Sequence, residues 1–76
     1  MNKELEKYYE ERFSMMASEG WKHLIEDAQI MKENYSNIAS INTAEELHFR
    51  KGQLDILDWL TSLKTISEAT FEELQE

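Results

Sequence analysis

The side chains in this sequence that could carry chemistry are two histidines and several clustered carboxylates. His23 and Asp27 are four residues apart, a spacing that places them on one helix face and would suit two metal ligands. The same spacing produces an ordinary exposed pair. His48 would lie near the loop end of the predicted hairpin and His23 far from it along the first helix, so the two could not meet within one hairpin. We therefore expect no metal site and no cofactor.

Four carboxylates form a second candidate, because a helical hairpin could bring them together across its two helices. Paired carboxylates can act as acid and base or bind cations. A di-metal helical bundle would also need Glu-x-x-His motifs, and the sequence contains none. We favour the interpretation that they belong to a solvated charged face. The residues concerned are Glu26, Asp27, Asp55 and Asp58.

A third candidate is a basic patch formed by His48, Arg50 and Lys51. It could hold a nucleic-acid phosphate or an acidic partner surface. Affinity for nucleic acid grows with the number of phosphates neutralised, whereas this chain has 8 basic against 16 acidic residues and a net charge of −8. We therefore do not expect direct nucleic-acid binding. We favour pairing of the patch with nearby acids. The candidate acids are Glu33, Glu45, Glu46 and Asp55.

The rest of the sequence also argues against an enzyme. It has no Ser-His-Asp set, phosphate loop or dinucleotide fingerprint. The absence of cysteine excludes a thiol enzyme, a disulfide framework and a thiolate metal site. No run of about 18 apolar residues is present, so no membrane segment is expected. These features predict a single non-enzymatic domain over residues 1–76.

Helices must position all of these residues. The chain has no Pro and two Gly and is rich in strong helix formers. Apolar residues from Leu5 to Ile38 recur every three or four positions, which predicts one long helix over about 3–35. Gly20 is its weak point, where a kink or a break could occur. The stretch 34–42 is uncharged and rich in Asn and Ser, which predicts a loop.

A second helix is predicted over about 43–64. Thr43 followed by Glu46 matches a capping box at its start. A short C-terminal helix is predicted over about 67–75, with Ser67 or Thr65 as its cap. The fold class is therefore all-α, an antiparallel helical hairpin with a short C-terminal helix.

The turn near residues 38–41 also predicts which positions meet across the hairpin. The expected neighbours are Tyr35 with Leu47, Ala28 with Leu54, Leu24 with Leu57, and Trp21 with Leu60 and Thr61. Small residues would let helix backbones approach closely, with Gly52 near Ala28 and Gln29. The close-approach residues predicted in this way are Gly20, Ala28 and Gly52.

The chain has more apolar surface than one seam between two helices can cover. Hydrophobic residues make up 41% of it, and an elongated two-helix rod buries less surface than a compact protein. Short chains without disulfides or metals commonly depend on oligomerisation. We therefore expect protein partners, through self-association or docking on a larger protein. The predicted interaction surface is Tyr9, Phe13, Met16, Trp21, Phe49, Ile56 and Trp59.

The aromatic and methionine segment from Tyr8 to Met16 leaves two interpretations open. It could be an exposed docking face of the kind that Met and aromatic residues form. It could equally be core beneath the C-terminal helix.

Two segments, ERFSMMASEGWKHLIEDAQ and TAEELHFRKGQLDILDWLTSLK, resemble small uncharacterised helical proteins of tailed bacteriophages, including marine podovirus types. The resemblance implies a phage protein in the virion or host cytoplasm. It would be a minor virion component near the portal and head–tail region, or an early protein that acts on a host factor. The matching positions are Gly20, Trp21, Phe49, Arg50, Lys51, Gly52, Gln53 and Leu54.

Two functional hypotheses follow. In the first, the protein is a structural or assembly component that works through helix–helix packing. In the second, it is an inhibitor whose acidic face occupies the nucleic-acid-binding groove of a host protein, because a net charge of −8 would favour fast, salt-sensitive binding to a basic surface.

Overall fold

The computed structural model describes residues 2–75, and in this range all regular secondary structure is helical. The elements are α1 (Lys3–Met16), α2 (Glu19–Tyr35), a short 3-10 turn (Ile38–Ser40), α3 (Ala44–Thr61) and α4 (Leu63–Gln75). The predicted all-α hairpin with a short C-terminal helix is confirmed.

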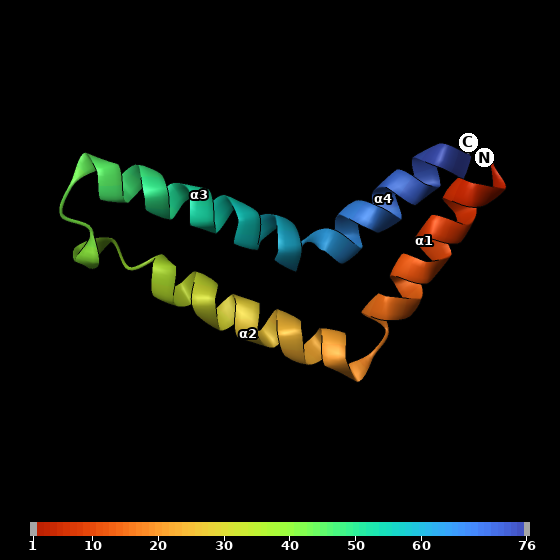
Figure 1. Cartoon of the computed structure of the whole chain (residues 1–76), viewed down its shortest axis with the longest axis horizontal. Coiled ribbons are helices and arrows are strands. Elements are labelled where there is room, and N and C mark those ends of the chain that lie inside the picture. The colour runs from red at the N-terminus through yellow and green to blue at the C-terminus, as the bar shows by residue number, and fades with distance from the viewer. Residues whose placement is uncertain (1, 76) are drawn as a thin grey trace.

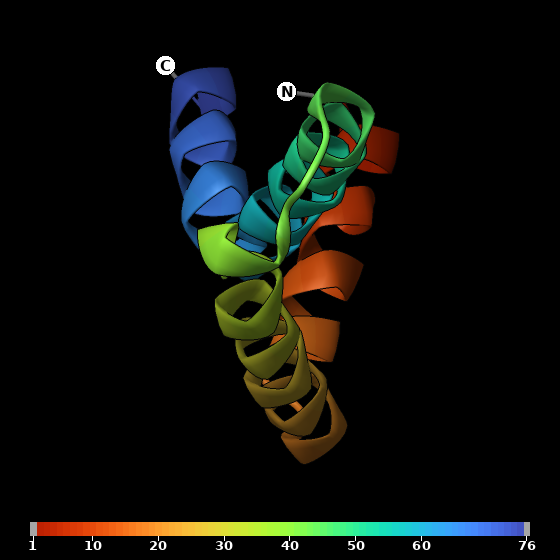
Figure 2. The same ribbon diagram turned by 90° about the vertical axis from the view of Figure 1, so that its left-hand side faces the viewer.

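The hairpin is bent in its middle, as Figure 1 shows. In one half α2 and α3 lie antiparallel, and in the other half α1 packs against α4, so that both arms of the hairpin finish in the same half of the molecule. Both arms are interrupted at about the same level, at residues 17–18 and at Ser62. In the view from the turn end, α3 lies above α2 whereas α4 and α1 lie to the left and right (Figure 2). The second helix pair is therefore rotated relative to the first.

The prediction of one long N-terminal helix is wrong, because the structure divides it into α1 and α2. The break is at Ser18 rather than at Gly20. The Ser18 hydroxyl accepts a hydrogen bond from the backbone N–H of Trp21 at 3.1 Å and donates one to the carbonyl oxygen of Met15 at 2.7 Å. Serine favours this position because its oxygen can satisfy an N–H group that the start of a helix leaves unpaired.

The boundary between α3 and α4 also differs from the prediction. α3 ends at Thr61, and α4 begins at Leu63, four residues before the predicted start. The Thr61 hydroxyl donates to the carbonyl oxygen of Leu57 at 2.9 Å, a local bond of the kind that often bends helices. Ser67, predicted as a cap, is instead 1% exposed inside α4.

The start of α3 agrees with the predicted cap. The Thr43 hydroxyl accepts from the Glu46 N–H at 3.1 Å. The Glu46 carboxylate accepts from the N–H of Asn42 at 2.8 Å, one residue before the cap itself. Two backbone donors at the helix start are thereby satisfied, which fixes where the turn ends.

The core is small and divided between the two halves. In the α1–α4 half, the Phe71 ring lies 5.8 Å from that of Tyr9 and 5.6 Å from that of Phe13, measured between ring centroids. In the α2–α3 half, Ala28 and Leu57 are buried. The molecule measures 50 × 26 × 15 Å with a radius of gyration of 16.1 Å, against about 11 Å for a compact domain of this length. Helix pairs this thin leave much apolar surface uncovered.

Candidate interaction surface

A groove that no Asp, Glu, Lys or Arg side chain lines lies along one face of the α2–α3 pair, and we call it the α2–α3 groove. Its volume is about 560 Å³. Phe49 and Ile56 in its lining are 70% and 66% exposed, and Met31 is 43% exposed. The lining residues are Met31, Tyr35, His48, Phe49, Gly52, Gln53, Ile56 and Leu57.

Helical spacing places these side chains on one face. Phe49 and Ile56 are seven residues apart on α3, which is about two helical turns, with Gly52 between them. Met31 and Tyr35 are one turn apart on α2. The groove therefore has anchors at i, i+3 and i+7 on α3 and at i and i+4 on α2, the pattern of an amphipathic helix surface.

The groove differs from the rest of the surface in charge. None of its lining residues is Lys, Arg, Asp or Glu, whereas each of the other four pockets described within residues 2–75 includes at least one. Charge is present nearby on the same helix pair, where Lys32 and Asp58 form an ion pair at 2.7 Å. Lys32 directly follows Met31 in α2, and a rotation of about 100° per residue turns it away from the groove.

Three of the residues predicted for the interaction surface are buried or half-buried in the core between α1 and α4. Tyr9 and Met16 are buried, at 9% and 4% exposed, and Phe13 is half-buried against Phe71. Of the two interpretations of this segment, the structure favours core beneath the C-terminal helix. The physical reason is that α4 packs against α1 and places the Phe71 ring on Tyr9 and Phe13.

The two tryptophans lie apart from the α2–α3 groove. Trp21 is half-buried and shares a different pocket with Thr61, close to its predicted neighbour position. Trp59 is 50% exposed and is not among the groove residues. Phe49 and Ile56 are thus the members of the predicted set that line the groove.

The close approach predicted at the two glycines does not occur within the chain. Apart from adjacent residues and the backbone of the same helix, no atom lies within 4 Å of the position that a Cβ would take at Gly20 or at Gly52. Ala28 is 3% exposed and belongs to the seam between α2 and α3. Leu24, predicted to face Leu57, is instead 51% exposed.

Arg50, the middle residue of the basic patch, forms a structural contact with the end of α2. Arg50 donates through Nη1 to the carbonyl oxygen of Tyr35 at 3.1 Å, and its guanidinium lies 5.4 Å from the Tyr35 ring centroid. Tyr35 is the last residue of α2, where carbonyl groups lack helical partners and a positive charge is favourable. The favoured pairing with nearby acids is not formed, since no carboxylate within residues 2–75 is within 4.0 Å of Arg50 or Lys51.

A second arginine with a structural role was missed from the sequence. Arg12 donates through Nη1 to the hydroxyl of buried Ser67 at 3.3 Å and also bonds the Tyr8 hydroxyl. Its guanidinium lies 4.7 Å from the Tyr8 ring centroid and 5.7 Å from that of Tyr9. Arg12 thereby joins α1 to α4. The available signal was an arginine one helical turn after a tyrosine within an aromatic segment.

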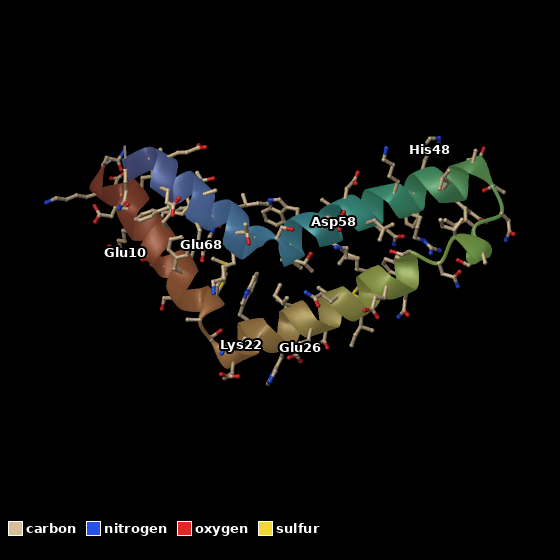
Figure 3. All side chains as sticks on the ribbon, turned by 180° about the vertical axis from the view of Figure 1, so that it is seen from behind. Glu10, Lys22, Glu26, His48, Asp58 and Glu68 are labelled. Atoms are coloured by element: carbon tan, nitrogen blue, oxygen red, sulfur yellow. The ribbon has the colours of Figure 1, made fainter. Side chains whose placement is uncertain are left out.

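The carboxylates proposed as an acid–base or cation-binding set do not converge. Every Asp and Glu within residues 2–75 is exposed. Asp58 pairs with Lys32, and Figure 3 shows Glu26 on the outer side of α2, away from Asp58 on α3. His23 lies near the start of α2 and His48 near the start of α3, at opposite ends of this helix pair.

The described part of the chain contains no group of three His, Asp or Glu side chains placed to hold a metal ion. None of its helices combines the length and the apolar character needed to cross a lipid bilayer. Comparison with protein-family models, with curated proteins and with solved structures gives no match. Function must therefore be inferred from the geometry of the surface itself.

Proposed function

We propose that this protein is not an enzyme and that it acts by packing the α2–α3 groove against a helical surface of a protein. The observation that carries the proposal is a groove lined by no Asp, Glu, Lys or Arg in a chain of which these residues make up 32%. Water covers the exposed rings and methyl groups of Phe49 and Ile56 in the isolated chain, and a partner helix would replace it.

The total surface area supports the same proposal. The chain exposes 5961 Å², whereas a compact protein of this mass would expose about 4,900 Å². The excess, on the order of 1,000 Å², is comparable with the roughly 800 Å² that each partner contributes to a standard protein–protein interface. The isolated chain therefore has surface to spare for one interface of ordinary size.

The setting we propose is a tailed bacteriophage, with the protein as a minor virion or assembly component near the portal and head–tail region. Support for this setting comes from the resemblance of the segments around Trp21 and Phe49 to small phage proteins. Mass spectrometry of purified virions tests it directly. Absence of the protein from virions and from assembly intermediates would overturn the virion assignment while leaving groove-mediated packing open to its own test.

A matched pair of variants tests the groove. Ile56→Lys places a charge in the groove, whereas Ile30→Lys makes the same change at a site that is 57% exposed and outside the groove. Wild type and Ile30→Lys should co-elute with purified portal or head–tail proteins or assemble with themselves, and Ile56→Lys should lose this association. Equal association by the two lysine variants, or none by the wild type, would refute the proposal.

The second candidate is the acidic inhibitor of a host nucleic-acid-binding or defence protein. The observation that favours it is the exposure of every Asp and Glu within residues 2–75 along a molecule 50 Å long. Three of these carboxylates are paired with lysines, which reduces the free negative charge. Its binding to a basic host protein should weaken steeply with salt and be indifferent to Ile56→Lys. Failure to bind such proteins at low salt would remove this candidate.

A further inference from the structure

Gly52 is unexplained by the packing of its own chain. It lies in the interior of α3, its φ is not positive, and nothing is within 4 Å of the position of a Cβ. Glycine in such a position weakens a helix relative to alanine. Its position between Phe49 and Ile56 leaves a flat place in the α2–α3 groove where another helix backbone could come close. The close approach that glycine permits is thus available to a second molecule.

Charge limits which molecule can occupy the groove. A strongly acidic or basic partner would find little opposite charge there, because His48 is the one ionisable side chain of the lining besides the Tyr35 phenol, and none of the lining residues is Asp, Glu, Lys or Arg. Two copies of a chain of net charge −8 repel each other wherever their carboxylates meet. Contact through the groove is the arrangement that lets two copies associate without bringing carboxylates together at the centre of the interface.

The shape of the molecule points to the same occupant. Its smallest dimension is 15 Å, which leaves the α2–α3 pair as a single layer without a covering element on the groove side. Stacking a second such pair would give a four-helix arrangement with the groove residues at its centre. The excess surface of the whole chain, on the order of 1,000 Å² per copy, is enough to supply the roughly 800 Å² per partner of a standard interface.

We infer that the occupant of the α2–α3 groove is a second copy of this chain, related by a two-fold axis that passes beside Gly52. In such a dimer Phe49 and Ile56 of each copy pack near Gly52 of the other copy. A two-fold contact is self-complementary, so one groove supplies both the anchors and the surface that receives them. This inference rests on the proposed function and names the partner for the same surface.

Sedimentation velocity over a wide concentration range tests the dimer. Wild type and Ile30→Lys should change from monomer to dimer with rising concentration. Ile56→Lys should raise the dissociation constant by at least about 30-fold, the effect of losing a central interface residue. Far-UV circular dichroism of the three proteins checks that each remains helical.

Disulfide cross-linking tests the position of the axis. The chain has no cysteine, and both glycines have free space for a new side chain. Under mild oxidation Gly52→Cys should give a covalent dimer, because the two thiols face each other across the axis. Gly20→Cys, the matched control outside the groove, should remain largely unlinked.

The outcomes separate this inference from the proposed function. A wild type that stays monomeric at all concentrations and does not cross-link through Gly52→Cys overturns the dimer. If that monomer still binds portal or head–tail proteins and Ile56→Lys abolishes the binding, the proposed function stands with a different partner. Loss of dimer in Ile30→Lys, or equal cross-linking through Gly20→Cys, places self-association on another face and also overturns the inference.

Discussion

Replacing Gly52 by alanine should stabilise the isolated chain. Alanine is favoured over glycine by about 1 kcal/mol in a helix interior. At Gly52 this gain is not offset by a clash, because no atom lies within 4 Å of the new Cβ, or by backbone strain, because φ is not positive. For a domain of this size, about 1 kcal/mol corresponds to a rise in melting temperature of roughly 4–8 °C.

The measurement is thermal unfolding of Gly52→Ala followed by circular dichroism at a concentration where the chain is monomeric. Gly20→Ala is the control. Gly20 is the second residue of α2, where frayed helix ends make propensity count for less, so its gain should be smaller. A melting temperature that is unchanged or lowered in Gly52→Ala at low concentration would refute the assignment of Gly52 as unpacked within its own chain. In the dimer Gly52→Ala should instead be destabilising, because the added methyl group would separate the α3 helices of the two copies.

Three further substitutions test the contacts that shape the hairpin. Ser18→Ala removes the cap of α2 and should lower the free energy of unfolding by about 1 kcal/mol in urea titrations, whereas exposed Ser14→Ala should change it little. Arg50→Ala removes the bond to the Tyr35 carbonyl and should cost about 1.5 kcal/mol by the same measurement, with exposed Lys51→Ala close to wild type. A double-mutant cycle on Lys32 and Asp58 should give a coupling below about 1 kcal/mol that falls with added salt, because their side chains are 42% and 55% exposed.

Local signals account for the parts of the fold that could be predicted. The helix-forming composition, the polar loop at 34–42 and the Thr43 cap each act within about four residues, so the sequence alone indicates them. Ser18 carried the same kind of signal. One continuous helix was nevertheless predicted, with Gly20 as its weak point, because apolar spacing runs through Ser18 without interruption.

The candidate site could be predicted in part for a related reason. Phe49 and Tyr9 both belong to apolar stripes with helical spacing, and spacing does not distinguish a stripe that will be covered from one that will stay exposed. Tyr9 is buried because α4 packs against α1. Phe49 remains 70% exposed because no element of the described chain covers that face of α3.

The sequence by itself determined that this protein is helical, that its chain reverses once within the polar stretch 34–42, and that its apolar surface exceeds what a single helix seam can bury. The tertiary structure decided where the hairpin bends, which aromatic residues form its core and which remain on the groove. The physical reason is the sequence separation over which each kind of interaction acts. Caps and helix propensities depend on neighbours within one turn, whereas contacts such as Arg12 with Ser67 join residues 55 positions apart and exist only once the helices have packed.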